Sequence, residues 1–219
     1  MIKNYTTSNL LSDSKEIKHY FGKKNFLFPD SEKIYFLNQL HSNKVIFISS
    51  ESDLNRQEGG DAIISSKRNF FIGIKTADCV PILLSDRNSS FVAAIHAGWR
   101  GTFYKVLDET IKKIVKEFNC NPKDIIAAIG PSIGMCCYEI NLSLWEKFNQ
   151  RFTLAPDDFN QIGKKYYLNL QSINKNLLNN NGIESIDLIL NCTKCDESFY
   201  SYRRDGSTEQ SQISIIKLN

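Results

Sequence analysis

No stretch of this sequence is long and apolar enough to span a membrane, and residues 1–16 contain no apolar core of signal-peptide length. We therefore expect a cytoplasmic protein without a membrane partner. Basic residues are scattered along the chain and the formal net charge is only +3, which argues against a nucleic-acid-binding surface. Small molecules are the expected ligands.

The sequence also contains no internal repeat, no low-complexity tract and no linker rich in Pro, Gly or Ser. We therefore interpret residues 1–219 as a single domain. A chain of this length buries roughly 70% of its unfolded surface, so its core needs neither disulfides nor a structural metal. The six cysteines are unevenly spaced, and in a reducing compartment they are better interpreted as thiols or ligands than as a disulfide framework.

The hydrophobic pattern predicts a mixed α/β fold. Helical spacing of apolar residues is clearest over 103–118, and further helices are predicted over 142–152 and 170–180, the last ended by Gly182. Short runs of β-branched and aromatic residues predict strands. These runs cover residues 33–37, 44–48, 70–76, 81–85, 91–96, 124–130, 185–190 and 212–218.

The segment "AAIHAGWRGT" (93–102) joins a predicted strand to a predicted helix through a glycine-bounded turn. Gly98 and Gly101 allow a ligand to approach the backbone closely, and the helix N-terminus presents unpaired amides. Arg100 adds a planar fork suited to phosphate or carboxylate. The segment therefore suits an anion site, although a tight turn carrying a solvated arginine fits the same residues.

Three residues near predicted strand ends form a candidate metal site. They are His41, Cys79 and His96, and their separations suit ligands that neighbouring strands bring together. Two His and one Cys make an open zinc shell with a position left for water or substrate. A buried cysteine and two locally bonded histidines are the alternative. The third histidine, His19, lies in a polar run and is expected at the surface.

Other polar residues leave their roles open. Asp61 and Asp78 lie beside the candidate metal site, and either could orient an imidazole or act as acid or base. The pair Cys192 and Cys195 lacks a second C-x-x-C at zinc-ribbon spacing, so we expect it to be incidental. Residues 130–140 suit a functional loop, although a turn with two buried thiols explains them nearly as well. The arginines at 203–204 could reach an anion but are expected in solvent.

The motifs of the chain resemble, in order, those of the YfiH/YlmD family. They are "NQLHS" (38–42), "GDAIIS" (60–65), "TADCVPILL" (76–84), "HAGWRGT" (96–102), "GPSIGMCCYEI" (130–140) and "CTKCDESFYSYRRDG" (192–206). Two departures stand out. Ser132 replaces a cysteine that is frequent in the family's "GPCIG" loop, and "TEQSQIS" (208–214) replaces its "TGRQ" type of ending, which puts an anion contact there in doubt.

The resemblance implies a single α/β/β/α layered domain, similar to the cysteine-hydrolase-like toxin fold, with a metal held by His41, Cys79 and His96. It implies a zinc-dependent purine nucleoside phosphorylase acting on adenosine, inosine, guanosine and methylthioadenosine, with adenosine deaminase activity. Within that activity we assign catalytic roles to Cys79, Arg100 and Asp78, and phosphate binding to Gly98, Arg100 and Gly101. A monomer or weak dimer is expected.

Three alternatives to this activity stay open. The family is also described as a copper-dependent polyphenol oxidoreductase, or laccase, but only His19 would remain to build the additional copper cluster. Copper in vitro is still expected, because it outbinds zinc at nitrogen and sulfur sites. The fold resemblance also suggests a metal-free hydrolase in which Cys79 attacks and His96 takes its proton. A binding module without turnover is the third alternative.

Overall fold

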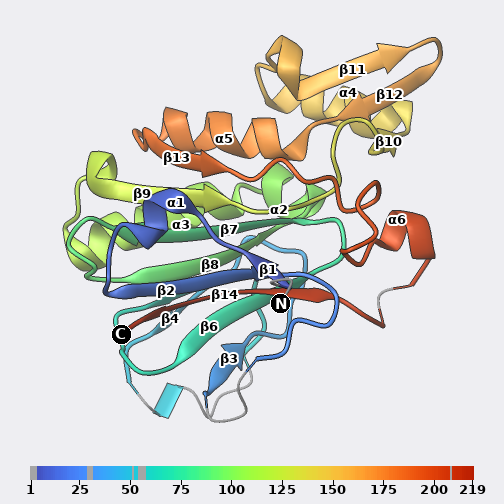
Figure 1. Cartoon of the computed structure of the whole chain (residues 1–219). Helices are drawn as coiled ribbons and strands as arrows, with labels where there is room; N and C mark the ends of the chain where they lie inside the picture. The colour runs from blue at the N-terminus through green and yellow to red at the C-terminus, as the bar shows by residue number, and fades with distance from the viewer. Residues whose placement is uncertain (1–3, 29–31, 51, 54–57, 208) are drawn as a thin grey trace.

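The chain folds as two large β-sheets packed face to face, with helices on one side (Figure 1). The structure is a computed structural model and describes residues 4–28, 32–50, 52–53, 58–207 and 209–219. One sheet has six strands, in the order β13 (Ser185–Leu188), β9 (Ile125–Ile129), β7 (Val80–Asp86), β8 (Val92–Ala97), β5 (Ala62–Ser65) and β4 (Val45–Ile48). The other has five, in the order β1 (Tyr5–Thr6), β2 (Ile17–Gly22), β14 (Gln212–Leu218), β6 (Phe71–Thr76) and β3 (Ile34–Phe36).

The six-stranded sheet is buried on both faces, and its strands alternate between two cores. On β7, Ile82 and Leu84 pack toward the helices while Leu83 packs toward the five-stranded sheet. On β8, Ile95 packs toward the helices and Ala94 packs toward the five-stranded sheet. Period-two alternation with apolar residues on both faces explains why these strands appear in the sequence as continuous apolar runs.

The helices differ from expectation mainly at the start of the longest one. The described helices are α1 (Asn9–Ser12), α2 (Trp99–Phe103), α3 (Val106–Phe118), α4 (Leu142–Arg151), α5 (Leu170–Asn180) and α6 (Tyr202–Asp205), with short 3₁₀ turns at Pro122–Asp124 and Pro156–Asp158. The helix predicted over 103–118 is interrupted, because Lys105 takes a left-handed conformation with φ of 64°. The predicted glycine-bounded turn is itself part of a separate five-residue helix, α2, which has Gly98 as its N-cap and contains Gly101.

The other two predicted helices are confirmed nearly to the residue, as α4 and α5. Each begins at an asparagine whose side chain accepts a hydrogen bond from a backbone amide, Asn141 from Leu144 and Asn169 from Ser172. Gly182 follows α5 with φ of +83°, a conformation that favours glycine.

The sequence did not indicate a small third sheet, which projects from the body beside α4 (Figure 1). It contains β10 (Glu139–Ile140), β12 (Lys165–Leu168) and β11 (Phe159–Ile162). Its strands are short and largely exposed. Strands β2 and β5 were also missed, yet each contributes to the cores.

The mixed fold with several sheets is the predicted class. The outer face of the five-stranded sheet is covered in the described residues by aromatic side chains of the segment after β2, where Phe26 packs on Tyr20 and Phe28 on Phe71.

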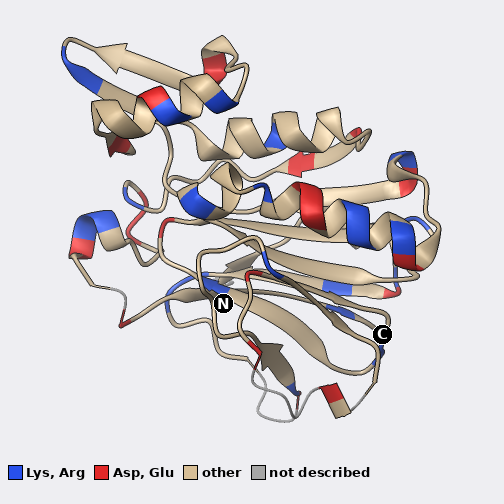
Figure 2. Cartoon of the chain, turned by 180° about the vertical axis from the view of Figure 1, so that it is seen from behind, with Lys and Arg blue, Asp and Glu red and all other residues tan. Residues whose placement is uncertain are grey.

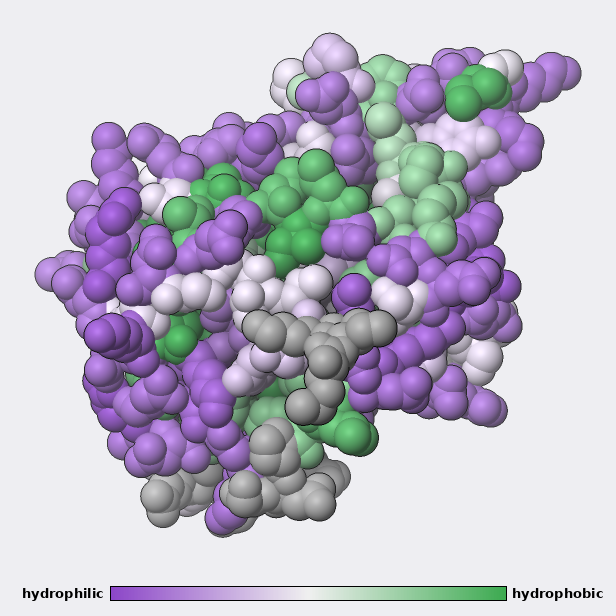
Figure 3. Space-filling view, viewed as in Figure 1, coloured by the Kyte–Doolittle hydropathy of each residue, from purple (hydrophilic) through white to green (hydrophobic). Residues whose placement is uncertain are grey.

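No helix of the described residues is long and apolar enough to cross a membrane. Acidic and basic residues are interleaved along α3 (Figure 2). The face seen in Figure 3 is mostly hydrophilic, with an apolar area near its centre.

His19 is not a surface residue, contrary to expectation. It lies on β2 with 3% of its surface exposed, and its Nε2 atom accepts a hydrogen bond of 2.8 Å from the Ser8 amide. Its polar sequence neighbours alternate outward on the strand, which explains the error. Burial lowers the pKa of His19 to about 4.

This burial predicts a loss of stability in mild acid. The unfolded chain takes up a proton on His19 below pH 6.5, whereas the folded chain does so only near pH 4. The contribution of His19 is therefore complete above pH 6.5 and lost as the pH falls toward 4, a difference of about 3 kcal/mol in the free energy of unfolding. Urea unfolding at pH 7 and pH 5 should show a weaker pH dependence for His19→Gln than for the wild type. Equal pH dependence of the two proteins would contradict the prediction.

Candidate active site

The strands bring His41, Cys79 and His96 together. His96 is the fifth residue of β8 and is paired with Pro81 of β7, so Cys79, just before β7, lies next to it. His41 lies on the loop that leads into β4 and has φ of 55°. One potential ligand atom of each residue lies within 4.8 Å of those of the others, and the two imidazole rings cross at 81°. The structure thus gathers the three residues that the sequence suggested for a metal.

Asp61 is the carboxylate that positions the two histidines. It is fully buried, and its Oδ1 atom lies 2.8 Å from His96 Nδ1. The carboxylate also accepts hydrogen bonds from the backbone amides of Leu40, His41 and Ser42 and from the Ser42 hydroxyl. Burial raises the pKa of Asp61, but the hydrogen bonds from His96 and Ser42 outweigh it and hold that pKa at about 2. With Nδ1 held by an ionised carboxylate, His96 directs its Nε2 atom at the cluster.

The same cluster shifts the protonation of the thiol. Burial raises the pKa of Cys79, but His96 and His41 reverse this effect and lower it to about 6. Burial lowers the pKa of His96, whereas the Cys79 thiolate and Asp61 raise it to about 9. A thiolate is the form of cysteine that binds metals and attacks carbon, so this electrostatic arrangement suits both chemistries.

The two glycines of the turn have different surroundings. A Cβ atom on Gly98 would lie 2.8 Å from the Cys79 sulfur and 3.6 Å from the His41 ring, so the absence of a side chain makes room for the cluster. Gly101 is buried, and a Cβ there would lie 3.1 Å from the His96 carbonyl oxygen. Close packing of α2 on β8 thus accounts for Gly101, and a role of either glycine in binding phosphate stays a prediction.

Asp78 lies beside the cluster, but its carboxylate bonds to residues other than the two imidazoles. Its backbone has φ of 87°, and its carboxylate accepts hydrogen bonds of 2.7 Å from the Thr193 hydroxyl and from the Arg203 amide. Both bonds tie the turn before β7 to residues 193–203. Of the two carboxylates left open by the sequence, Asp61 orients an imidazole, and Asp78 holds a neighbouring loop in place.

A cleft of about 420 Å³ opens next to the cluster, a volume within the range of small-molecule sites. Arg100 lies over the Trp99 ring at 4.5 Å, and Arg203 lies over the Tyr138 ring at 5.4 Å. Burial raises the pKa of the Tyr138 phenol, which therefore stays protonated. The lining residues are His41, Ala77, Asp78, Cys79, Trp99, Arg100, Ile133, Tyr138, Leu170, Tyr202 and Arg203.

Several of these residues were missed or placed in solvent. Tyr138 and Tyr202 carried no role in the sequence analysis, and Arg203 was expected in solvent. Arg203 is exposed, but it lines the cleft, and its guanidinium donates to the Glu139 carbonyl at 2.8 Å. The available signal was their occurrence in two glycine-containing loop motifs, since loops carry a large share of binding residues.

The sequence suggested that the pair of Cys192 and Cys195 is incidental, but the structure places two further cysteines beside it. Cys136 and Cys137 fold against this pair, and the potential ligand atoms of all four cysteines lie within 4.8 Å of one another. Ser132, where relatives of this type were expected to carry cysteine, is fully buried with no hydrogen-bond partner for its hydroxyl. The segment 208–214 includes Thr208, which lies outside the described residues.

The chain is similar to known proteins over most of its length. Residues 21–219 match a family model described as multi-copper polyphenol oxidoreductase laccase. The purine nucleoside phosphorylase YfiH of Escherichia coli is 35% identical to this chain over 177 residues, which cover 80% of this chain and 70% of that protein. The chain belongs to the YfiH/YlmD family. A purine nucleoside phosphorylase of Clostridium acetobutylicum is 31% identical over 97% of this chain and 85% of its own. The crystal structure of a Neisseria meningitidis protein matches with a TM-score of 0.87 and 25% identity, covering 99% of this chain and all of that one.

The family description and the names of the relatives point to different chemistries, and the histidines of this YfiH/YlmD member bear on the choice. The sequence has three histidines in all. His41 and His96 belong to the cluster, whereas His19 is bound to Ser8 on the five-stranded sheet. No histidine therefore remains for an additional copper cluster of the multi-copper type.

Proposed function

We propose that this protein is a purine nucleoside phosphorylase that also deaminates adenosine, with both reactions in the cleft beside His41, Cys79 and His96. The observation that carries the proposal is the juxtaposition of an open three-ligand cluster, two cleft arginines and a wall of aromatic residues in one cavity. The names of the relatives support the phosphorylase part of the proposal. Adenosine, inosine, guanosine and methylthioadenosine are the proposed nucleosides.

The donors of the cluster fit a zinc ion. Two imidazoles and a thiolate are ligands that zinc prefers, and three protein ligands are usual at a catalytic zinc site. Asp61 supplies the outer carboxylate that fixes the His96 tautomer. A zinc ion in such a site supplies a Lewis acid and lowers the pKa of water, which is the chemistry that hydrolytic deamination of adenosine to inosine and ammonia requires.

In phosphorolysis, the chain's own residues bind and orient the two reactants. A phosphate oxygen forms a bond to C1′ of the ribose, the N-glycosidic bond breaks, and the purine leaves with its bonding electrons and takes up a proton. Arg100 and Arg203 both line the cleft, and we assign them to the phosphate because guanidinium groups bind such anions through paired hydrogen bonds. Tyr138 and Tyr202 provide ring surfaces for a purine.

The direct test is a turnover assay of zinc-replete protein. Incubation with inosine and phosphate should yield hypoxanthine and ribose 1-phosphate in equal amounts, and adenosine without phosphate should yield inosine. Binding of nucleosides by calorimetry without any turnover would favour the binding-module alternative. Absence of base release from all four nucleosides would reject the proposed phosphorylase.

Arg100→Ala should weaken the use of phosphate while metal content stays at the wild-type level. Arg100 lies outside the cluster and carries the charge that we assign to the anion, so kcat/KM for phosphate should fall by roughly 10- to 100-fold, as loss of a charge-assisted contact costs about 1.5–3 kcal/mol. Deamination should change less, because it uses no phosphate.

Arg151→Ala is the matched control for this prediction. Arg151 also lies over an aromatic ring, that of Phe103 at 5.0 Å, but it does not line the cleft. Its removal should leave both reactions near the wild-type rate. Equal losses of deamination and phosphorolysis in Arg100→Ala would show that Arg100 shapes the cleft rather than binding the anion.

A metal-free thiol hydrolase is the second candidate function. Its supporting observation is that Asp61, His96 and Cys79 lie in the order of a carboxylate, base and nucleophile, with a short Asp61–His96 contact. This candidate predicts rapid alkylation of Cys79 and insensitivity to chelators. His41 has no necessary role in it, which makes that residue the discriminating one.

We further propose that residues 1–219 act as one cytoplasmic domain, as a monomer or weak dimer. None of the six cysteines forms a disulfide, which suits a reducing compartment. Size-exclusion chromatography with light scattering at two protein concentrations tests the proposed oligomeric state. Copper uptake in vitro is expected at the same cluster, because copper(II) outbinds zinc at nitrogen and sulfur donors.

A further inference from the structure

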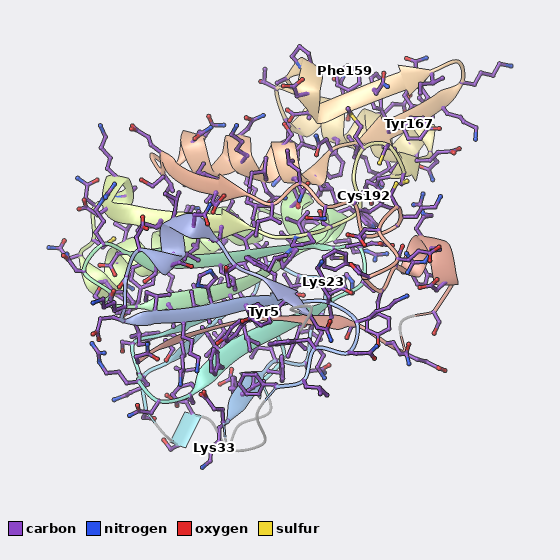
Figure 4. All side chains as sticks on the ribbon, in the orientation of Figure 1. Tyr5, Lys23, Lys33, Phe159, Tyr167 and Cys192 are labelled. Atoms are coloured by element: carbon purple, nitrogen blue, oxygen red, sulfur yellow. The ribbon has the colours of Figure 1, made fainter. Side chains whose placement is uncertain are left out.

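Four cysteines form a second cluster at the end of the six-stranded sheet where the small sheet begins. The Cys137 and Cys195 sulfurs are 3.3 Å apart, and those of Cys136 and Cys195 are 3.8 Å apart. Together with Cys192, the four sulfurs lie within 4.8 Å of one another. Figure 4 shows sulfur atoms gathered close to the labelled Cys192, on the side that faces the labelled Tyr167 of the small sheet.

Backbone hydrogen bonds hold the two cysteine-bearing loops in register. Ser132 and Cys192 form a parallel bridge, and the Thr193 amide donates to the Ser132 carbonyl at 3.0 Å. The Gly134 amide donates to the Cys192 sulfur at 3.2 Å. A sulfur that accepts an amide hydrogen bond is stabilised as a thiolate, the form that metals require. The loops therefore keep their sulfurs convergent by contacts that do not involve a metal.

We propose that Cys136, Cys137, Cys192 and Cys195 bind a structural zinc ion through four thiolates. Four converging sulfurs are the complete ligand set of a closed zinc site, which leaves no position for substrate. The pairing of a C-x-x-C with two adjacent cysteines from a distant loop explains why the sequence spacing did not reveal it. This site is separate from the cluster of His41, Cys79 and His96 and does not depend on the proposed nucleoside chemistry.

The charges around the cluster suit four thiolates and one divalent ion, which together carry two negative charges. Arg204 donates to the carbonyls of Thr193 and Lys194, between the two cysteines of the pair. Arg203 donates to the Glu139 carbonyl, two residues after Cys137. Two guanidinium groups thus lie against the cysteine-bearing loops. Arg204 also pairs with the Asp205 carboxylate, so Arg203 is the one of the two that offsets the negative charge of the site more fully.

The zinc ion would connect the small sheet to the candidate active site. Cys136 and Cys137 immediately precede Tyr138, which lines the cleft, and β10 follows. Thr193, inside the cysteine pair, donates to Asp78 beside Cys79. A metal that joins these loops is therefore a positioning element, since it fixes two walls of the cleft without touching a substrate.

Metal counting tests the proposal in the intact protein. After reconstitution with zinc under reducing conditions, elemental analysis should give two ions per chain for the wild type, one for each cluster. His41→Ala and Cys195→Ser should each retain one, and Cys120→Ser, which alters a thiol outside both clusters, should retain two. Cys195→Ser should also melt at a lower temperature than Cys120→Ser.

A cobalt spectrum keeps the test independent of whether Cys195→Ser folds. In His41→Ala, which leaves the four cysteines unchanged, cobalt(II) should give the intense absorption of tetrahedral thiolate coordination. Absence of that absorption, or a zinc content that is the same in Cys195→Ser and the wild type, would overturn the proposal. Stoichiometric iron or copper at this site, or disulfides detected by mass under non-reducing conditions after anaerobic purification, would overturn it as well.

Discussion

His41→Ala should lose the zinc ion of the His41, Cys79 and His96 cluster together with its nucleoside turnover, while the four-cysteine site keeps its own ion. Only Cys79 and His96 would remain as protein donors at the cluster, too few to hold zinc at a catalytic site. We expect the loss in zinc affinity to exceed the roughly 10- to 100-fold that changes in outer residues typically cause. Zinc titration against a competing chelator and the inosine phosphorolysis assay measure the two effects on one preparation.

The fold of His41→Ala should survive, because His41 is exposed and the core is built without it. A modest fall in melting temperature relative to zinc-loaded wild type is expected from lost ligand binding alone. His19→Gln serves as the matched control, since it alters a histidine on the other sheet and should leave zinc binding and turnover unchanged.

Cys79→Ala and His96→Ala should both be inactive, whichever chemistry the cluster performs. His41→Ala separates the two candidate functions, because the thiol-hydrolase mechanism uses only Cys79, His96 and Asp61. If His41→Ala kept its turnover and lost only the zinc ion of this cluster, while Cys79→Ala was inactive, the thiol-hydrolase function would replace the proposed one. Rapid alkylation of Cys79 in the metal-free protein would then be expected as well.

Buried apolar runs were the most predictable part of the fold. Strands β7, β8 and β9 are apolar over almost their whole length because both faces of the six-stranded sheet are covered. The small sheet carried no such signal, since its strands are short and Leu168 is their only fully buried residue. The break at Lys105 was equally hidden, because a left-handed lysine within an amphipathic pattern leaves the spacing of apolar residues unchanged.

Site residues were predictable where a reactive side chain stands at the end of an apolar strand. They were not predictable where contacts between distant segments determine which side chains meet. His41, Cys79 and His96 each stood out as reactive residues beside apolar runs. The choice between Asp61 and Asp78 required the structure, because both residues lie close to strand ends in the sequence. Only the structure shows that the Asp61 carboxylate contacts His96, whereas the Asp78 carboxylate contacts Thr193. The four cysteines converge only after residues 136 and 192, far apart in sequence, are brought together by a bridge at Ser132.

Asp61→Asn should destabilise the protein and impair the metal cluster at once. The fully buried carboxylate accepts five hydrogen bonds, three of them from consecutive backbone amides. An asparagine amide group can accept through its oxygen only, so its NH₂ must face donors in either orientation. We expect the free energy of unfolding to fall by about 3 kcal/mol or more, because buried donors lose their partner.

Zinc affinity should fall in the same variant by roughly 10- to 100-fold, since His96 loses the carboxylate that fixes its tautomer and His41 loses its backbone anchor. Asp86→Asn is the matched control: Asp86 is also buried and accepts two hydrogen bonds from Ser90, but it lies at the opposite end of β7 from Cys79. It should lose stability while binding zinc normally. If Asp61→Asn bound zinc as tightly as Asp86→Asn, the carboxylate would serve the fold alone, and the histidines would be positioned by the packing of β8 and the loop before β4.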